Sequence, residues 1–316
     1  MTKYCSSLLL ILSLISFESI AKPLVIGTVA YRGTSQAHQR WDRTIEYLEQ
    51  EIPGQKFILK PLTLGQLEQQ VSNNQLDFLL GNPGLYYTLK HHGLNPISSL
   101  VNKRNGKGYD QFGAIIFARA DSSNIYSLKD IKGKRFGAVS KKAFGGFQMA
   151  WREFKSHNIN PYTDFKEMKF IGFPMDNVVY QVRDNKLDAG TVRTDILERM
   201  GSKGLIDIND YKILNSHRYS DFPFKVSTRL YPEWIISKAK QTPDIITKQV
   251  QQALLKLTRK HPAAVAGNYI GWTHEDRMNQ LLSMSLSELT EVNLNEDRFI
   301  SIDQMMQELK IGPYKE

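Results

Sequence analysis

Short apolar runs alternate along the chain with stretches in which apolar residues recur every three or four positions. Runs of the first kind occupy 24–31, 57–62 and 77–81 and predict buried strands. Stretches of the second kind occupy 41–48 and 64–71, where Trp, Ile, Leu and Val fall on one helical face. Strands that alternate with amphipathic helices are typical of α/β architecture, so the pattern predicts that fold class.

The same order of strand, helix, strand and helix returns about 110 residues later in the chain. The letters GTVA at 27–30 match GAVS at 137–140, an offset of 110 residues, and NQLD at 74–77 matches NKLD at 185–188, an offset of 111. Two four-residue matches can arise by chance. Their agreement in offset and in structural context favours a duplicated lobe.

The duplication indicates where a binding site lies, because ligands of open α/β sheets bind at the carboxyl ends of strands. The offsets align residues 31–32 with 141–142, each pair directly after the first strand of a lobe. They also align Asn82 with Arg193, each five residues after the shared aspartate. We therefore expect two polar strand ends per lobe to face a common cleft.

The segment 140–147, with the letters SKKAFGGF, carries the clearest chemical signal. It runs from a predicted strand through a glycine pair into a helix that we expect to begin near Gly146. Free backbone N–H groups and the helix dipole favour an anion there, and Ser140 and the lysines add donors. The segment is not a P-loop, because no Lys-Ser or Lys-Thr pair follows the last glycine. A βα loop with solvated lysines is the alternative.

Arginines at other strand ends extend the candidate site. Arg32 suits a sulfonate or phosphonate through two parallel hydrogen bonds, and a surface arginine before a helix is the alternative. Arg193 is the second candidate, although Asp195 or Glu198 could pair with it. Asn82 is expected to cap a helix, which also suits an anionic ligand. The candidate ligand-binding residues are Tyr31, Arg32, Asn82, Tyr86, Ser140, Lys142, Phe144, Gly145, Gly146, Arg193 and Thr194.

Residue constellations that would support catalysis are poor in this sequence. His91 and His92 are adjacent rather than four apart, so their rings diverge on a helix and cannot share a metal ion. The seven histidines form no metal-ligand spacing, and the chain has no Gly-x-Ser-x-Gly motif. We therefore expect a binding protein rather than an enzyme, with no cofactor and no metal.

The first 21 residues are typical of a secretory signal peptide. Lys3 precedes an apolar run at 8–17, and Ser19 and Ala21 place small residues before a cleavage point. No apolar segment approaches the ~20 residues that a membrane-spanning helix needs, so we expect no membrane anchor. Cys5, the only cysteine, would leave with the signal peptide, which excludes disulfides from the mature chain. We expect the protein in the periplasm of a two-membrane bacterium.

The formal net charge of +9 favours negatively charged ligands, because a basic protein raises the local concentration of anions. A solubility surface is the alternative explanation. Nucleic acid is not an expected partner, since the lysines are scattered rather than gathered in one stripe with aromatic residues.

Two lobes in one chain require crossing segments. Residues 114–118 predict a strand that leaves the first lobe, and 211–214 and 224–230 bring the chain back. From Pro232 onward the pattern is helical, and we expect these helices to pack on the first lobe. The expected limits are 22–113 and 215–316 for lobe 1 and 114–214 for lobe 2.

Six short motifs follow one another in a specific order: AYRG at 30–33, PLTL at 61–64, GNPGLY at 81–86, FGGFQ at 144–148, VRTDILE at 192–198 and LYPEW at 230–234. They resemble the phosphonate-binding-like periplasmic proteins, and especially the ligand-sensing domain of tetrathionate sensor histidine kinases. The resemblance spans residues 24–314. It implies a type II periplasmic binding-protein fold, with two lobes joined by two crossover segments and a ligand enclosed on lobe closure.

Two departures from these families affect the expected function. The sensor kinases continue into a transmembrane helix and a kinase module, whereas this sequence stops at Glu316, so we expect it not to signal by itself. The phosphonate-binding proteins carry a Ser/Thr-rich loop where this chain has KKAF at 141–144, which favours a sulfur oxyanion. We expect a monomer that captures a small anion and meets the membrane subunits of an ABC importer or a separate sensor kinase.

Overall fold

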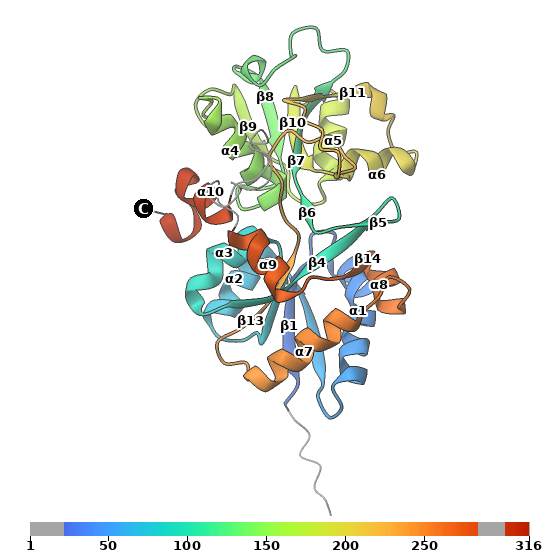
Figure 1. Cartoon of the computed structure of the whole chain (residues 1–316). Coiled ribbons are helices and arrows are strands. Elements are labelled where there is room, and N and C mark those ends of the chain that lie inside the picture. The colour runs from blue at the N-terminus through green and yellow to red at the C-terminus, as the bar shows by residue number, and fades with distance from the viewer. Residues whose placement is uncertain (1–21, 284–300, 316) are drawn as a thin grey trace, which may run out of the picture.

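The computed structural model describes residues 22–283 and 301–315 of the chain. These residues form two lobes, each built on its own β-sheet, and the last described helix lies beside the junction between them (Figure 1). The predicted two-lobed α/β architecture is confirmed. The predicted signal peptide at 1–21 lies outside the described residues. Within the described part of the chain, no helix combines the length and the hydropathy needed to cross a membrane.

The sheet of the first lobe has seven strands and contains segments from both ends of the chain. At its centre β1 pairs in parallel with β2 and β3, and β13 joins β3 in the antiparallel sense. The strand order is β14-β4-β13-β3-β1-β2, with β5 on β4. The bounds are β1 Leu24–Val29, β2 Phe57–Leu62, β3 Phe78–Gly81, β4 Asn95–Arg104, β5 Lys107–Tyr109, β13 Ile235–Lys238 and β14 Tyr269–Trp272.

The sheet of the second lobe has five strands in the order β11-β7-β10-β8-β9. Here β8 pairs in parallel with β9 and β10, as β1 does with β2 and β3 in the first lobe. The strand β7, which enters the lobe, is antiparallel to both of its neighbours. The bounds are β7 Ala114–Arg119, β8 Arg135–Ala138, β9 Glu167–Phe170, β10 Ala189–Arg193 and β11 Tyr211–Leu214.

The repeated sequence letters make the same contacts in both lobes. The backbone N–H of Val25, in β1, donates to Asp77 Oδ2 at 2.8 Å. The backbone N–H of Arg135, in β8, donates to Asp188 Oδ2 at the same distance. Each aspartate thus holds the start of the strand that follows it, β3 or β10, against the first strand of its lobe. The donor is a backbone N–H, so only the position of the aspartate requires a particular side chain.

The glycine of each repeat is explained by the small space around it. A Cβ on Gly27 would lie 2.5 Å from Leu76, and a Cβ on Gly137 would lie 2.2 Å from Leu187. Those leucines are the third letters of the repeated NxLD motif. Because a Cβ almost never lies this close to another atom, a larger residue at either glycine would force the leucine side chain to move.

Helices cover both sheets, and their buried faces are those that the periodicity predicted. In α1 the side chains of Trp41 and Leu48 are each 1% exposed, and in α2 Leu67 is fully buried. The first-lobe bounds are α1 Thr34–Glu51, α2 Leu64–Ser72, α3 Pro83–Leu89, η1 Lys90–His92, α7 Asp244–Lys256, α8 Pro262–Gly267 and α9 Glu275–Ser283. The second-lobe bounds are η2 Lys129–Ile131, η3 Phe144–Gln148, α4 Met149–Ser156, α5 Asp176–Arg183, α6 Ile196–Ser202 and η4 Ile208–Asp210.

The two crossings run side by side as a short antiparallel pair. Strand β6 (Gln111–Phe112) leads out of the first lobe, and β12 (Tyr231–Pro232) leads back. The segment between β11 and β12 contacts both lobes: Ser227 Oγ accepts a hydrogen bond from Ile116 N at 2.8 Å, and Phe222 packs edge-on against Tyr109. The lobe limits set from the sequence therefore stay a proposal.

The C-terminal helices do not all pack where the sequence indicated. The helices α7 and α8 lie against α1 in the first lobe, as expected. Helix α10 (Ile302–Leu309), followed by η5 (Gly312–Tyr314), instead contacts both α3 and α4 and so touches the two lobes together. Its apolar stripe enters a cluster between the lobes that includes Phe144 and Tyr231. The periodicity identified the buried face of this helix but not its partner.

Candidate functional site

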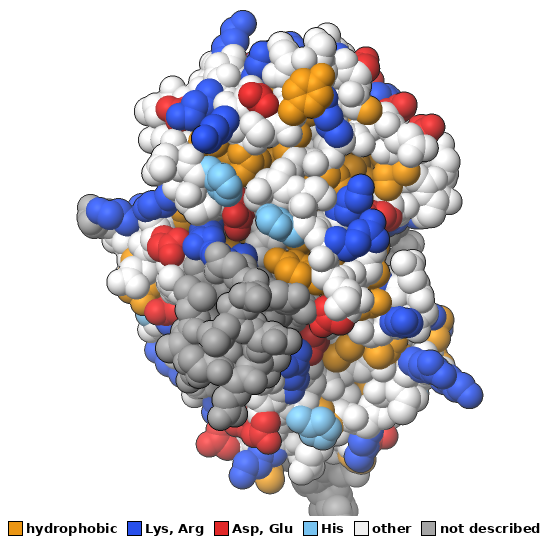
Figure 2. Space-filling view, turned by 45° about the horizontal axis from the view of Figure 1, so that its top comes forward, with side chains coloured by type: hydrophobic (Ala, Val, Ile, Leu, Met, Phe, Trp, Pro, Cys, Tyr) orange, Lys and Arg blue, Asp and Glu red, His pale blue; other side chains and the backbone are white. Residues whose placement is uncertain are grey.

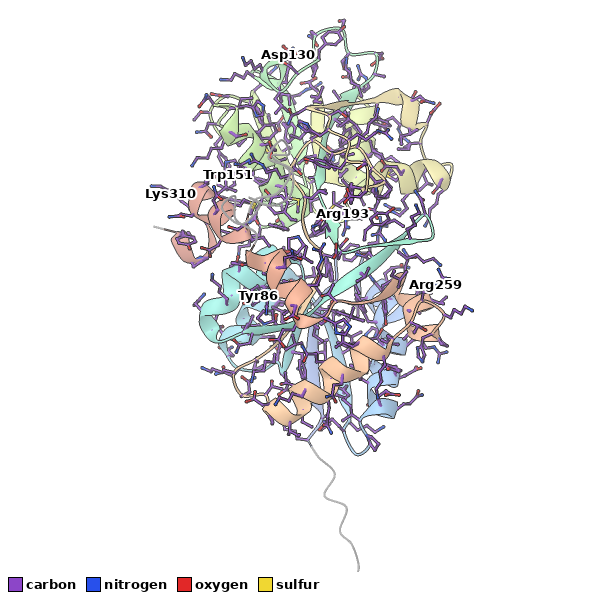
Figure 3. All side chains as sticks on the ribbon, in the orientation of Figure 1. Tyr86, Asp130, Trp151, Arg193, Arg259 and Lys310 are labelled. Carbon is purple, nitrogen blue, oxygen red and sulfur yellow. The ribbon has the colours of Figure 1, made fainter. Side chains whose placement is uncertain are left out.

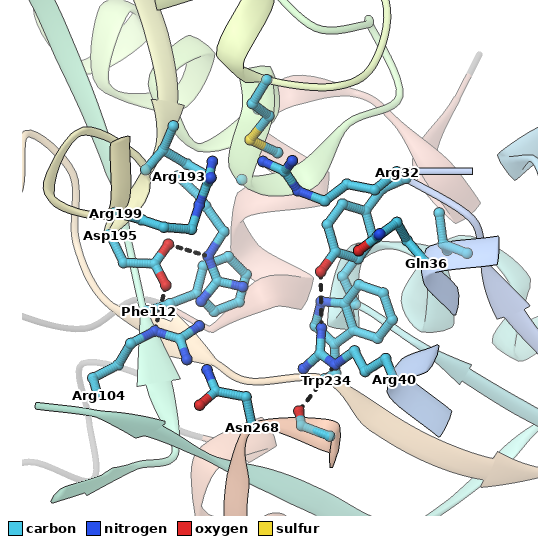
Figure 4. Close-up of a pocket in the computed structure, with 18 of the residues that line it drawn as sticks. Arg32, Gln36, Arg40, Arg104, Phe112, Arg193, Asp195, Arg199, Trp234 and Asn268 are labelled. Atoms are coloured by element: carbon cyan, nitrogen blue, oxygen red, sulfur yellow. Dashed lines mark hydrogen bonds and ion pairs between the residues drawn. The ribbon is translucent and has the colours of Figure 1, made fainter. Parts of the chain in front are cut away.

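A cavity of about 690 Å³ lies between the lobes. The first lobe contributes the segment after β1, the side of α1 and the end of β3, and the second lobe contributes η3 and the end of β10. Arginines reach the cavity from opposite sides, with Arg193 and Arg199 facing Arg32 and Arg40 (Figure 4). Its volume lies within the range of small-molecule sites, about 300–1,000 Å³.

Most of the residues predicted from the sequence come together around this cavity. Figure 3 shows Arg193 at the junction of the lobes, whereas Tyr86 lies within the first lobe. The predicted residues that line the cavity are Tyr31, Arg32, Asn82, Phe144, Gly145, Gly146 and Arg193. Tyr86, Ser140, Lys142 and Thr194 do not line it. Contact with a ligand remains a prediction for all of them.

Asn82 stands at the carboxyl end of β3 as the N-cap of α3. Its Oδ1 accepts a hydrogen bond from Leu85 N at 3.0 Å, with Pro83 in the first turn, as the sequence predicted. Capping uses the carbonyl oxygen of the amide and leaves the NH₂ group at the cavity wall. Asn82 can therefore donate to an anion while it caps the helix.

The glycine pair of the second lobe allows a close approach of chain segments. Helix η3 is a π-turn that begins at Phe144, two residues earlier than expected, and runs into α4. A Cβ on Gly145 would lie 2.7 Å from the Phe112 ring and 3.2 Å from Arg193 Cβ. Glycine therefore lets this turn lie directly against the floor of the cavity, where Phe112 and Arg193 meet.

Lys142 and Ser140 form contacts at the edge of the cavity instead of lining it. Lys142 Nζ lies 2.5 Å from Glu68 Oε2, which belongs to α2 of the other lobe. Ser140 Oγ accepts a hydrogen bond from Lys142 N at 3.1 Å and so orders this turn. The Lys142–Glu68 pair is exposed, with the lysine side chain 60% accessible, so it adds little stability.

Thr194 and Tyr86 are likewise occupied by the protein itself. Thr194 forms two hydrogen bonds with Gly113 at the first crossing. The backbone N–H of Thr194 donates to Gly113 O at 2.9 Å, and the backbone N–H of Gly113 donates to Thr194 Oγ1 at 3.3 Å. Tyr86 packs edge-on against Tyr87, with ring centroids 5.2 Å apart, and burial raises its pKa. Thr194 therefore supports the junction, whereas Tyr86 packs within the first lobe.

Arg193 is paired with carboxylates, which was the alternative that its sequence neighbours suggested. Its Nη2 lies 2.6 Å from Glu233 Oε1, and its Nε lies 3.7 Å from Asp195 Oδ1. The guanidinium also lies 4.2 Å above the ring of Phe112. Burial by itself lowers the pKa of Arg193, but Glu233 and Asp195 outweigh it and hold the pKa above its usual value. The side chain is thus charged and fixed.

Arg32 and Arg199 share one carboxylate across the lobes. Both form ion pairs with Asp176, the first residue of α5, whose side chain is 9% exposed. Burial raises the pKa of Asp176, but the hydrogen bond and charge of Arg199, together with the charge of Arg32, outweigh burial and lower it. Asp176 therefore stays ionised and links Arg32 of the first lobe to the second lobe.

Asp195 connects a further arginine to the site. It forms an ion pair with Arg104, at the end of β4, as well as with Arg193. Asp195 has a left-handed backbone, with φ of 76°, at the start of α6, which turns its carboxylate toward both arginines. Nearby, burial and the charge of Asp195 raise the pKa of Glu198, which also lines the cavity.

Arg40 lines the cavity and was missed by the sequence reasoning. It projects from α1 and donates to Tyr31 Oη at 3.0 Å, Gly267 O at 3.2 Å and Asn102 Oδ1 at 3.2 Å. One feature of the sequence could have identified Arg40: it is a charged residue that follows Ala37 by one turn, inside the apolar stripe of this helix.

Cations outnumber acids on the walls of the cavity. The basic residues are Arg32, Arg40, Lys103, Arg104, Arg193, Arg199 and Lys203, and the acidic residues are Asp195 and Glu198. On the face shown in Figure 2, Lys and Arg side chains elsewhere are scattered over both lobes. Across the described residues, no three His, Cys, Asp or Glu side chains are grouped so as to hold a metal ion. The walls of the cavity therefore carry more positive than negative side chains.

Comparisons with known proteins agree with this geometry. Residues 26–278 match the family described as ABC transporter, phosphonate, periplasmic substrate-binding protein. The tetrathionate sensor histidine kinase TtrS of Salmonella typhimurium is 33% identical over 231 residues, which cover 72% of this chain and 38% of the kinase. The phosphate-import protein PhnD of Mycolicibacterium smegmatis is 25% identical over 134 residues, which cover 41% of this chain and 40% of that protein. Each match thus spans less than half of the relative.

A solved structure extends the likeness to nearly the whole chain. PhnD1 of Prochlorococcus marinus, in complex with methylphosphonate, superposes with a TM-score of 0.64 at 13% identity. The superposition covers 92% of this chain and 98% of PhnD1. At this identity the likeness shows the fold, and it confirms the two-lobed, type II architecture that the sequence predicted.

Proposed function

We propose a function from one premise: this chain belongs to the family of periplasmic substrate-binding proteins of phosphonate ABC transporters, as its six motifs predicted. In this proposal it captures a small oxyanion between its lobes in the periplasm, after removal of the signal peptide. The lobes close about the two crossings, β6 and β12, and hide the ligand from water. The liganded form then meets the membrane subunits of an importer.

The arginines of the cavity are the observation that supports an anionic ligand. Five of them line it, and they come from both lobes. Guanidinium groups donate in a planar fork that matches the oxygens of sulfonates and phosphonates. An anion between the lobes would therefore contact both at once and favour the closed form, because a ligand shifts the equilibrium toward the form that it binds better.

The ligand that we propose is a sulfur oxyanion such as tetrathionate, with a phosphonate or phosphate as the alternative. The sulfur ligand is suggested by the name of the kinase relative, and the phosphorus ligands by the names of the family and of PhnD. The loop at 141–144, Lys-Lys-Ala-Phe, lacks the hydroxyl donors expected of a phosphonate loop. Among the predicted contacts, Arg32 and Arg193 would bind charge and Asn82 would donate its amide.

A panel of anions tests the proposal. The melting temperature of the purified protein is measured with tetrathionate, thiosulfate, sulfate, phosphate and methylphosphonate at millimolar concentration, with chloride as the control for ionic strength. We expect at least one oxyanion to raise it, because a ligand that binds only the folded form stabilises it by mass action. If none does, the oxyanion proposal is wrong.

A second fate for the liganded protein follows from the kinase relative. The identity of 33% lies within a sensor kinase, so this chain could present its ligand to a separate two-component kinase. Crosslinking in cells, with and without the oxyanion found above, separates the two. A ligand-dependent adduct with a histidine kinase favours sensing, and one with transporter membrane subunits favours import.

We propose binding without turnover. The family and the superposed structure are binding proteins, and among the described residues that line the cavity no nucleophile lies against a base. Long incubation with a bound oxyanion followed by ion chromatography tests this. A new product that requires the intact protein would show an enzyme instead.

A further inference from the structure

Four of the five arginines on the cavity wall already have a carboxylate partner. Arg32 and Arg199 pair with Asp176, and Arg104 and Arg193 pair with Asp195. Arg193 has Glu233 as a second partner. A ligand that draws on these four must compete with a carboxylate that already occupies the guanidinium, which weakens the gain from each contact.

Arg40 differs from the other four because its acceptors are all neutral. They are the phenol oxygen of Tyr31, the amide oxygen of Asn102 and the backbone carbonyl of Gly267. Within residues 22–283 and 301–315, no carboxylate forms an ion pair with it. The positive charge of Arg40 is therefore uncompensated by the part of the protein that the structure describes, although its side chain is half-buried.

The guanidinium of Arg40 is also held rigidly. It lies 4.5 Å over the ring of Trp41 and 5.5 Å from the ring of Trp234, and these two indoles are stacked on each other. Trp41 is 1% exposed, so the support is part of the core. Three hydrogen bonds and two aromatic faces fix the group before any ligand arrives, which lowers the entropy cost of binding.

Donors remain at this position for a ligand. A guanidinium has five N–H groups, and Arg40 uses three of them in the hydrogen bonds described. Tyr31 accepts from Arg40, so its own O–H stays available as a donor. Two N–H groups and one O–H thus belong to one uncompensated positive centre at the cavity wall.

We infer that Arg40, supported by Tyr31, is the primary anion anchor of the cleft, an inference that rests on the proposed oxyanion function. Its donors suit a group that presents several oxygens, such as a sulfonate, a thiosulfate or a phosphonate head, rather than a halide. Arg32 and Arg193 then act second: they join the lobes through Asp176 and Glu233 and contact the ligand with what donors remain.

Calorimetric titration of Arg40→Gln with the tightest oxyanion of the panel tests the inference. We expect the affinity to fall about 10- to 100-fold, the range for losing a hydrogen-bonded charge. Arg43→Gln is the matched control, because Arg43 lies on the same helix with its side chain 64% exposed and paired with Glu46. It should bind like the wild type. Arg32→Gln should lose less than Arg40→Gln.

The competing explanation is that Arg40 only stabilises the packing of α1 against its neighbours. If the role is purely structural, Arg40→Gln will have a lower melting temperature, but its folded fraction will bind the oxyanion with unchanged affinity. That outcome overturns the inference and leaves the proposed oxyanion function in place. If the wild type binds no oxyanion of the panel, the proposed function itself fails.

A spectroscopic measurement covers the case in which Arg40→Gln does not fold. The arginine Nε–H resonances of the wild type are followed during titration with the same oxyanion, and Arg40→Lys identifies the signal of Arg40. We expect this resonance to shift with saturation. A signal that stays fixed while the protein saturates would contradict direct contact.

Discussion

Arg193 and Glu233 form a largely buried ion pair across the junction of the lobes, with Nη2 and Oε1 2.6 Å apart and the Arg193 side chain 16% exposed. Arg193 ends β10 of the second lobe, and Glu233 follows β12, the strand that returns to the first. Glu233 is 1% exposed. The contact therefore joins the floor of the cavity to the crossing that contains β12.

Replacing Glu233 by Gln should destabilise the protein. The change keeps the shape of the side chain but leaves the Arg193 cation short of a buried counter-charge, which costs about 3 kcal/mol when a buried pair is broken. Urea unfolding followed by circular dichroism measures the loss. The exposed pair of Arg43 and Glu46 gives the control, and Glu46→Gln should change stability by less than about 1 kcal/mol. An equal loss of unfolding free energy in the two variants would show that the Arg193–Glu233 pair contributes no more to stability than an exposed pair.

Asp176 should make stability depend on pH at the acidic end. Because Arg199 and Arg32 lower its pKa in the folded protein, its contribution is complete above the unfolded pKa of about 3.9 and is lost as pH falls through the lower folded pKa. Asp176→Asn should therefore be less stable than the wild type at pH 7, and the difference should shrink toward pH 2. A difference that is constant over this range would exclude the ionised carboxylate as its cause.

Tyr31 should make ligand affinity depend on pH at the alkaline end. Burial raises the pKa of this phenol, but the charges of Arg40, Arg193 and Arg32 outweigh burial and hold the pKa below 10. Deprotonation removes a donor and adds a negative charge, so oxyanion affinity should begin to fall at a lower pH than the ordinary tyrosine pKa of about 10. Tyr31→Phe should bind more weakly at pH 7 and show a flatter profile. If affinity depends on pH in the same way in Tyr31→Phe and in the wild type, Tyr31 does not take part in binding.

Gly145→Ala should strain the contact between η3 and the cavity floor. The new Cβ would lie 2.7 Å from the Phe112 ring, so one of the two segments must shift, at a cost of about 1–3 kcal/mol. Differential scanning calorimetry measures the change in melting temperature. Gly65→Ala is the control, because a Cβ there meets nothing within 4 Å and lies in helix α2. An unchanged melting temperature in Gly145→Ala would mean that the turn is not tightly packed.

The sequence was most informative where one residue determines a local structure. The repeated aspartates Asp77 and Asp188 marked equivalent strand ends, and both hold the first strand of their lobe through a backbone N–H. Asn82 and Pro83 marked the start of a helix for a different reason, since a cap and a first-turn proline act within one turn. The helix cap depends on neighbours within one turn. The aspartates act over 52 and 53 positions, and the sequence marked them because the motif that contains them is repeated.

The missing parts depend on residues that are far apart in the chain. Arg32 and Asp176 are 144 positions apart, and Arg193 and Glu233 are 40 apart, so no spacing rule could join them. Arg40 stood inside a helical stripe, where a charged residue is easily taken as the edge of the exposed face. The sequence could thus locate the cavity and suggest Asp195 as a partner of Arg193, but it could not identify the ion pairs that join distant segments.

Helix α10 gives the lobes a third connection besides the two crossings. Asp303 pairs with Lys90 on the first lobe at 2.8 Å, and Glu308 pairs with Arg152 on the second at 3.0 Å. If the lobes separate, the helix can stay with only one of them, and its ion pair with the other lobe must break. The fraction of molecules that are closed before any ligand arrives then depends on this helix, and apparent affinity scales with that fraction. Residues that lie outside the cavity can in this way set the ligand concentration at which the protein becomes occupied.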